Sequence, residues 1–399
     1  MKKNNGFESI CVHDRVPTLN TTPQQTPIYA TSSFAFDSIE QGIDVFLGNE
    51  NGHFYSRYGN PTVEAVADKI AALEGFGLPN PTFGLMTSSG MSAIATLFFG
   101  ILKTGDKVLT QGNLYGGTND LFEKVFRKLG IETVIVDLKN IEAVENALKN
   151  DAQIKLIYLE TPANPTLACY DLAALAAVGK ANQCWTVADN TFATPFLQQP
   201  LAVGVDFVIH STTKYLNGHG NSTAGIVLSQ HETLMKKEVF TAMKLVGTNL
   251  SPFEAFLTNT GLKTLSLRME KHCANAMKVA IWLTKQKQVQ LVNYPGLASH
   301  PDHILAKKQM KNGFGAMLSF ELAGGLEAGK RFMNRVKFCQ LAPTMGDAAT
   351  LILHPATMSH LNVPKEQREK NGISDGLIRL SVGIENVDDI IADLKHAIK

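Results

Sequence analysis

Between Phe83 and Ser229, short apolar runs alternate with amphipathic segments. The apolar runs are FGLMTS, KVLTQ, ETVIVD, IKLIYLE, WTVAD, FVIHS and AGIVLS. Several of them are separated by segments with helical character, namely MSAIATLFFGILK, TNDLFEKVFRKLG, IEAVENALKN and LAALAAVGKANQ. Apolar strands that alternate with helices are typical of a parallel sheet covered by helices on both faces. We therefore predict an α/β fold with a mostly parallel sheet in this part of the chain.

The two ends of the chain have different patterns. The first sixty residues contain few periodic elements and many turn residues, although their aromatic side chains favour an ordered arm over a disordered tail. A helix is predicted from Thr62 to Leu73, and after Leu250 one long helical stretch over residues 252–286 precedes shorter strands and helices. The pattern predicts three parts: an arm over residues 1–60, a large α/β domain over 61–250 and a smaller α+β domain over 251–399.

Composition narrows the class of protein. The 399 residues suffice for two domains, and 37 basic against 36 acidic residues leave a net charge of +1, which indicates neither nucleic acid nor an anionic membrane as a partner. No run of about 18 apolar residues occurs, and we expect a soluble, cytoplasmic protein. The five cysteines are scattered without CxxC spacing, which argues against a disulfide framework and against a metal site.

One segment carries the most chemical information. Residues 208–225 read VIHSTTKYLNGHGNSTAG, in which an apolar strand is followed by hydroxyl residues and then Lys214. Upstream, the apolar run WTVAD ends at Asp189. Taken alone, such a lysine is usually a solvated loop residue and such an aspartate a cap. Together they suit pyridoxal phosphate, because a lysine can form the Schiff base, hydroxyls can bind phosphate and an acid can keep the pyridine nitrogen protonated.

The motifs HSTTKYLNGHG and VADNTFATP resemble those of the Cys/Met-metabolism family of pyridoxal phosphate enzymes. This family includes cystathionine and methionine γ-lyases and homoserine-ester sulfhydrylases. The resemblance extends from PIYATSSFAF, near Pro27, to GLIRLSVGIE, which ends at Glu385. It implies the fold-type I architecture of a large and a small domain, pyridoxal 5'-phosphate as the cofactor, and a homotetramer built from two active dimers.

The resemblance assigns phosphate contacts to two segments. In LMTSSGMSAIATLFF a strand leads through Ser89 and Gly90 into a helix that begins near Met91. Exposed N–H groups and the helix dipole favour a bound phosphate there, although a plain serine cap explains the same residues. Ser211 and Thr213 add hydroxyls beside the lysine.

The resemblance implies that two residues of the arm contact the cofactor phosphate of a neighbouring subunit. Tyr55 and Arg57 lie in HFYSRYGNPT, where an arginine is more often a surface or interface group than a ligand. In the resembling family, the matching tyrosine and arginine reach across the dimer interface to the neighbour's phosphate. An arginine suits phosphate because its guanidinium can bind two oxygens at once. The resemblance therefore implies that the site of a monomer is incomplete.

The remaining site residues surround the reacting centre. Tyr115 matches the tyrosine that stacks on the cofactor ring and protonates the leaving group, and Asn164 matches a residue near the cofactor's phenolic oxygen, although an Asn-Pro turn also explains it. Arg379 lies in an apolar strand-like run, so it requires an anion, for which the substrate α-carboxylate is the obvious candidate. Thr344 stands where the family usually has serine. The resemblance makes Lys214 the proton shuttle of the reaction.

Three positions at which cystathionine-cleaving relatives differ, and a fourth residue that follows Tyr115, bear on the substrate. Cystathionine-cleaving relatives tend to have an acid, an arginine and an acid where this chain has Phe54, Asp120 and Pro343, so a short thioether is favoured here. Methionine γ-lyases, which the motifs resemble most, usually have cysteine where this chain has Gly116. We expect γ-elimination of L-methionine to methanethiol, ammonia and 2-oxobutanoate. The alternatives are γ-replacement by an O-acetylhomoserine sulfhydrylase and, after it, a cystathionine γ-lyase.

Two other classes share the fold. A non-catalytic protein is disfavoured because the lysine, the aspartate and the arginine are all intact. An aminotransferase would turn over a 2-oxo acid without releasing ammonia.

Overall fold

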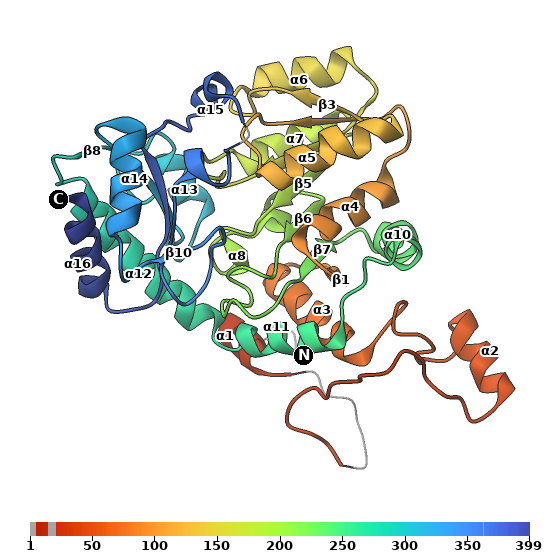
Figure 1. Ribbon diagram of the computed structural model, residues 1–399. Helices are drawn as coiled ribbons and strands as arrows, with labels where there is room; N and C mark the ends of the chain where they lie inside the picture. The colour runs from red at the N-terminus through yellow and green to blue at the C-terminus, as the bar shows by residue number, and fades with distance from the viewer. Residues whose placement is uncertain (1–4, 15–20, 362) are drawn as a thin grey trace.

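Two sheets with helices packed around them form the body of the protein (Figure 1). The computed structural model describes residues 5–14, 21–361 and 363–399, apart from the side chain of residue 367. Residues 1–4 and 15–20 of the predicted arm therefore lie outside the described residues. Among those that are described, no helix combines the length and the apolar composition needed to cross a membrane.

The larger sheet has seven strands in the order β1-β7-β6-β5-β4-β2-β3. All neighbouring pairs are parallel except those of β7, which is antiparallel to both β1 and β6. The mostly parallel α/β sheet predicted from the sequence is therefore confirmed. The strands are β1 (Phe83–Thr87), β2 (Lys107–Thr110), β3 (Glu132–Ile135), β4 (Ile154–Glu160), β5 (Trp185–Asp189), β6 (Phe207–His210) and β7 (Gly225–Ser229).

Helices cover both faces of this sheet because alternate strand residues point to opposite sides. In β4, Leu156 and Tyr158 pack in one apolar cluster with helices α4 and α5, whereas Ile157 and Leu159 pack in another with α6 and α7. The helices of this part are α3 (Pro61–Glu74), α4 (Gly90–Ile101), α5 (Gly116–Lys124), α6 (Ile141–Asn150), α7 (Leu172–Ala181), α8 (Thr194–Leu197), α9 (Glu232–Leu234), α10 (Phe240–Val246) and α11 (Pro252–Leu262).

The long helical stretch predicted over residues 252–286 is divided into two helices. The first, α11, packs against α3 beside the larger sheet, and the second, α12 (Leu265–Leu283), packs against the C-terminal sheet and α16. The break at residues 263–264 lets the two helices pack against different elements, although their buried residues belong to one apolar cluster. Periodicity alone could not place it, because both halves have helical patterns.

The smaller sheet has the order β10-β11-β12-β9-β8 and is antiparallel except between β10 and β11. Its strands are β8 (Val289–Asn293), β9 (Met317–Leu322), β10 (Gln340–Leu341), β11 (Leu351–Leu353) and β12 (Leu377–Ser381). The helices around it are α13 (His303–Gln309), α14 (Gly325–Arg335), α15 (Lys365–Lys370) and α16 (Val387–Ile398).

The described part of the N-terminal segment contains two short helices. The first, α1 (Phe7–Val12), packs against α3, while α2 (Ile39–Leu47) projects from the body at the lower right of Figure 1.

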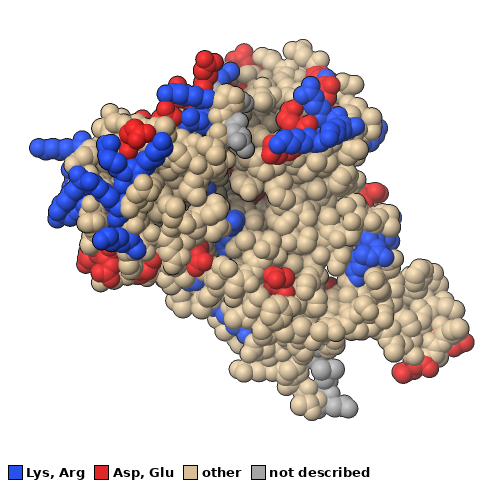
Figure 2. All heavy atoms as spheres, viewed as in Figure 1, with Lys and Arg blue, Asp and Glu red and all other residues tan. Residues whose placement is uncertain are grey.

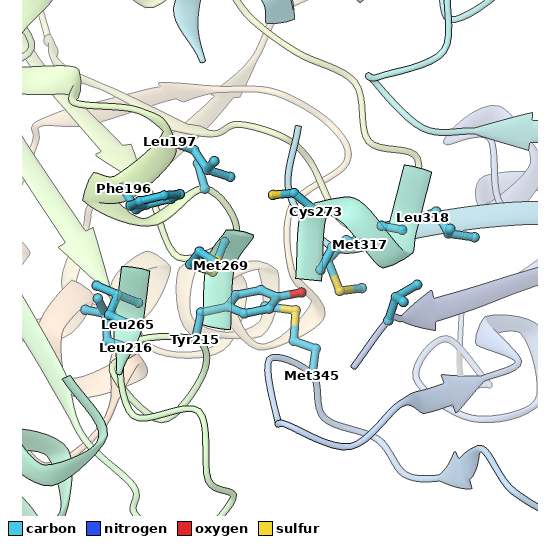
Figure 3. Packing of buried hydrophobic residues seen from close by; sticks show 14 of the residues in the cluster. Phe196, Leu197, Tyr215, Leu216, Leu265, Met269, Cys273, Met317, Leu318 and Met345 are labelled. Carbon is cyan, nitrogen blue, oxygen red and sulfur yellow. The ribbon is translucent and has the colours of Figure 1, made fainter. Parts of the chain in front are cut away.

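A buried apolar cluster lies directly behind the lysine loop. Tyr215 and Leu216, which follow Lys214 in the chain, are at most 1% exposed. Figure 3 shows the Tyr215 ring between Met269 and Met345, so the core joins the lysine loop to α12 and to the C-terminal part. This packing fixes the backbone that carries Lys214, because a side chain buried in a close-packed core has little freedom to move.

Candidate active site

A cavity of about 230 Å³ opens where the larger sheet meets the C-terminal part. Strands β4, β5 and β6 reach it with their carboxyl ends, which is where open α/β sheets bind ligands. The cavity brings together all of the predicted site residues except Tyr55 and Arg57. Those that line it are Ser89, Gly90, Met91, Tyr115, Asn164, Asp189, Ser211, Thr213, Lys214, Thr344 and Arg379.

Lys214 presents its amine inside this cavity. The Nζ atom donates a hydrogen bond to Thr344 Oγ1 at 2.7 Å. Burial, and after it the positive charge of Arg379, lower the pKa of Lys214 to about 8. A substantial share of the amine is therefore neutral near physiological pH, as condensation with an aldehyde requires.

Asp189 ends strand β5 with its carboxylate buried beside the cavity. Its Oδ1 atom accepts the backbone N–H of Thr191 at 3.0 Å, and Oδ2 accepts the Tyr158 hydroxyl at 3.4 Å. Burial raises the pKa of Asp189. A buried carboxyl group of this kind gains most from a cationic partner, which a protonated pyridine nitrogen would provide.

The start of helix α4 leaves two backbone donors free for an anion. Ser89 Oγ accepts the N–H of Ser92 at 3.0 Å, and Ser92 Oγ accepts the N–H of Ser89 at 2.7 Å. This capping box satisfies two of the helix's exposed donors, and the N–H groups of Gly90 and Met91 have no partner within the helix. They lie at the positive end of the helix dipole, where phosphate is favoured.

Gly90 also allows the lysine loop to approach this helix. A Cβ atom at Gly90 would lie 2.6 Å from the Cβ of Ser211, a separation that real side chains do not reach. The loop itself is held by Thr213, whose Oγ1 donates to the Ala224 carbonyl at 3.1 Å and accepts the Ala224 N–H at 3.0 Å. The helix terminus and the hydroxyls of Ser211 and Thr213 therefore border one region of the cavity.

Arg379 is a buried cation in the middle of strand β12. Its Nη1 atom donates to Asn164 Oδ1 at 3.3 Å, and Nη2 donates to the carbonyl oxygen of Thr344 at 2.9 Å. Burial lowers the pKa of Arg379 to about 10. Both of these acceptors are neutral, so the guanidinium favours a carboxylate bound in the cavity.

Tyr115 immediately precedes helix α5 and is 51% exposed. Its backbone N–H lies 2.9 Å from each carboxylate oxygen of Glu160. Glu160, which lines the cavity, was not among the predicted site residues. It ends the apolar run IKLIYLE, and the position of an acid at the end of a buried strand was the signal that could have identified it.

Tyr55 and Arg57 lie outside the cavity of their own chain. Arg57 donates from Nη1 to the Lys244 carbonyl, and its guanidinium carbon lies 4.7 Å from the centre of the Tyr58 ring. Tyr55 is 41% exposed.

Of the three positions at which cystathionine-cleaving relatives differ, one lines the cavity. Pro343 contributes to the cavity wall. Phe54 packs against the rings of Phe46 and Tyr58 in the arm, and Asp120 forms an ion pair of 2.8 Å with Lys124 on the surface of α5. Neither of these two belongs to the cavity lining of this chain.

Comparison with known proteins places the chain in a family. The model of the Cys/Met metabolism PLP-dependent enzymes matches residues 8–399. An L-methionine γ-lyase of Fusobacterium nucleatum is 49% identical over 375 residues, which cover 94% of this chain and 93% of the relative. A cystathionine β-lyase of Lactococcus lactis is 42% identical and covers 97% of each chain. The crystal structure of metB from Corynebacterium glutamicum superposes with a TM-score of 0.92 at 39% identity and covers 100% of this chain and 99% of that one.

The chain therefore belongs to the Cys/Met metabolism family of pyridoxal-phosphate-dependent enzymes. This confirms the family and the fold-type I architecture that the sequence motifs indicated. The residues present also fit the cofactor: a buried lysine, a buried carboxyl group and an uncapped pair of N–H groups at a helix start lie around one cavity.

Proposed function

We propose that the protein is a γ-lyase that converts L-methionine and water into methanethiol, ammonia and 2-oxobutanoate. The observation that carries this proposal is the buried pair of Arg379 and Lys214 in one cavity, which suits an amino acid substrate. The choice of methionine is supported by the 49% identity to an L-methionine γ-lyase and by the apolar Pro343 in the cavity wall.

Different residues of the cavity would bind different parts of the cofactor and of the substrate. Asp189 would hold the ring nitrogen of the cofactor, and Asn164 its phenolic oxygen. The backbone N–H groups of Gly90 and Met91, together with the side chains of Ser89, Ser211 and Thr213, would hold its phosphate. Arg379 binds the α-carboxylate of the substrate and thereby orients the α carbon toward Lys214. When bound, pyridoxal phosphate supplies an electron sink for the charge that develops on that carbon.

Three groups of the chain handle protons and leaving groups. Lys214 Nζ removes the proton from the α carbon, and its contact with Thr344 keeps the amine in the cavity between transfers. Tyr115 Oη donates a proton to the departing sulfur, which leaves as methanethiol. The aromatic ring of Tyr115, which lines the cavity, would also cover the cofactor and limit access of water.

Product analysis tests this function. Purified, cofactor-loaded enzyme is offered L-methionine, cystathionine and O-acetylhomoserine separately, each with and without sulfide. Methanethiol, ammonia and 2-oxobutanoate in equal amounts from methionine are expected. Homocysteine from O-acetylhomoserine and sulfide, with methionine unchanged, would instead identify a sulfhydrylase, and cleavage of cystathionine alone would identify a cystathionine lyase.

We also propose that the arm, residues 1–60, completes the site of a neighbouring subunit within a homotetramer. Helix α2 exposes an apolar face: Ile39, Phe46 and Leu47 are 76%, 69% and 67% exposed. In Figure 2 the surface of this lobe is mostly uncharged, with acidic residues at its edge. An apolar face of this kind favours burial against another protein surface.

A second cavity supports the same arrangement. It encloses about 290 Å³ next to the first and shares Thr213 and Thr344 with it, while Glu254 and Asp347 add carboxylates to its wall. That environment suits a cationic side chain such as Arg57 of a neighbouring subunit. Two observations support the contribution of the arm to a neighbouring subunit. Tyr55 is exposed, and Arg57 does not line the cavity of its own chain.

The division into a large domain over residues 61–250 and a smaller one over 251–399 stays a proposal, supported by the two separate sheets. A cytoplasmic location is also proposed. It is supported by the five cysteines, which are all buried and unpaired, as is usual in a reducing compartment.

A further inference from the structure

Glu160 connects two parts of the site. Its carboxylate accepts the backbone N–H of Tyr115 with both oxygens, at 2.9 Å each. Strands β4 and β5 are in register there, so that Glu160 stands directly beside Asp189. The Glu160 side chain therefore contacts the backbone of Tyr115, the proposed general acid. It also lies next to Asp189, the carboxylate proposed to bind the ring nitrogen of the cofactor.

The hydrogen bond between the Tyr115 N–H and Glu160 holds the backbone from which the Tyr115 ring projects. Tyr115 is the N-cap residue of α5, and its own side chain makes no capping hydrogen bond. The Glu160 side chain lies at this helix start, where its oxygens accept a backbone N–H that has no partner within the helix. On the other side the ring is packed closely, because a Cβ atom at Gly117 would lie 2.6 Å from Tyr115 Cε1 and 3.1 Å from Met91 Sδ.

We infer that Glu160 is a positioning residue that holds Tyr115 over the cofactor, an inference that rests on the proposed function. The geometry leaves the phenol free, since the Glu160 carboxylate contacts the backbone N–H of Tyr115 and not its side chain, and Tyr115 is 51% exposed in the cavity wall. Glu160 is itself 6% exposed. Burial, and after it the Asp189 carboxylate, raise the pKa of Glu160 to about 8, which means that its charged form is disfavoured in this environment.

A double-mutant cycle tests the inference. Glu160→Gln is made alone and together with Tyr115→Phe in the loaded enzyme. We expect Glu160→Gln to lower kcat by about 10- to 100-fold with KM little changed, because a small misplacement of a catalytic group has effects of that order. In the Tyr115→Phe background the same substitution should have no further effect. An equal loss in both backgrounds would overturn the inference.

The visible circular dichroism of the bound cofactor provides a readout besides activity. It should change in Glu160→Gln, because the orientation of the Tyr115 ring relative to the cofactor changes. Unaltered dichroism together with unaltered kcat would also overturn the inference. If Glu160→Gln does not fold, Glu160→Asp, which keeps the charge but withdraws it from the Tyr115 N–H, serves in its place with the same expectations.

Asp393→Asn is the matched control. Asp393 is a buried carboxylate that accepts the backbone N–H groups of residues 337–339, far from the cavity lining. The Asp393→Asn substitution should lower the melting temperature of the protein without changing the visible dichroism of the cofactor or kcat. If methionine proves not to be the substrate, the cycle is run with the substrate that is turned over, and the dichroism still decides the role of Glu160.

Discussion

Lys214 and Arg379 illustrate how single residues set the chemistry of this site. Both are positively charged groups taken out of water, and each is held by the same residue, Thr344, through its hydroxyl and its carbonyl oxygen. Burial, and after it the neighbouring guanidinium, lower the pKa of the amine. Arg379 therefore has two roles in the proposed function: it attracts the substrate carboxylate and it favours the neutral form of Lys214.

The first prediction concerns the pH dependence of cofactor binding. The pKa of Lys214 is lowered to about 8, so the fraction of neutral amine rises as the pH increases and approaches its maximum above that value. The rate at which cofactor-free protein takes up pyridoxal phosphate should therefore rise through about pH 8 and then level off. Arg379→Gln removes a positive neighbour and should move the midpoint to higher pH. A rate independent of pH across this range would contradict the account.

The second prediction concerns Arg379 and the substrate. Arg379→Ala should raise KM for the amino acid substrate by about 10- to 100-fold, because a hydrogen bond to a charged group contributes roughly 1.5–3 kcal/mol. Steady-state kinetics measure the effect. As a control, inhibition by the amine that lacks the carboxylate of methionine should be the same in both proteins. A KM that is unchanged in the variant would exclude Arg379 as the carboxylate ligand.

At the scale of elements, the start of helix α5 places Tyr115 in the cavity wall. Tyr115, Gly116 and Gly117 follow one another there, and the two glycines have different surroundings. A Cβ atom at Gly116 would meet only the Ser359 carbonyl oxygen, at 4.0 Å, whereas one at Gly117 would collide with the Tyr115 ring. Substitution at the first position therefore changes the cavity rim, and substitution at the second changes the position of the tyrosine.

The third prediction follows from that difference. Gly116→Cys should fold with a free energy of unfolding within about 0.5 kcal/mol of the parent and should alter the ratio of kcat/KM values for methionine and cystathionine. Gly117→Cys, the matched control, should lower kcat for every substrate because it displaces Tyr115. Thermal unfolding and kinetics measure both effects. Equal behaviour of the two variants would contradict the geometry of this helix start.

Sequence patterns predicted those parts of the fold and site that depend on local features. The strand ending at Asp189 and the loop containing Lys214 are recognisable because apolar runs precede them. The reversed direction of β7 and the break between α11 and α12 were not predictable, since both depend on packing between distant segments. Glu160 was missed although it ends the apolar run IKLIYLE, because its partner is a backbone N–H, which the sequence does not identify.

At the scale of the whole molecule, the proposed assembly explains why Tyr55 and Arg57 lie outside the cavity of their own chain. The cavity has contributions from the larger sheet and the C-terminal part, and its phosphate region has hydroxyls and N–H groups but lacks an arginine of the arm. An arm from a neighbouring subunit would supply that charge. Two complete sites would then form only when two chains associate.

The fourth prediction tests this exchange of residues between subunits. Lys214→Ala should be inactive, and Arg57→Ala should retain cofactor poorly after dialysis. When the two variants are combined in hybrid dimers, the intact Arg57 of one subunit serves the intact Lys214 of the other. Activity at limiting cofactor should therefore exceed that of either parent. Hybrids no more active than the mean of the parents would show that the arm serves its own chain.

The central claim is that the cavity around Lys214 is the pyridoxal phosphate site. Borohydride reduction of the loaded enzyme fixes the cofactor to the lysine that holds it, and mass spectrometry of the peptides identifies that residue. The account predicts one modified lysine, Lys214, and loss of the modification in Lys214→Ala. Modification of a different lysine in the unaltered protein would contradict the assignment of the site.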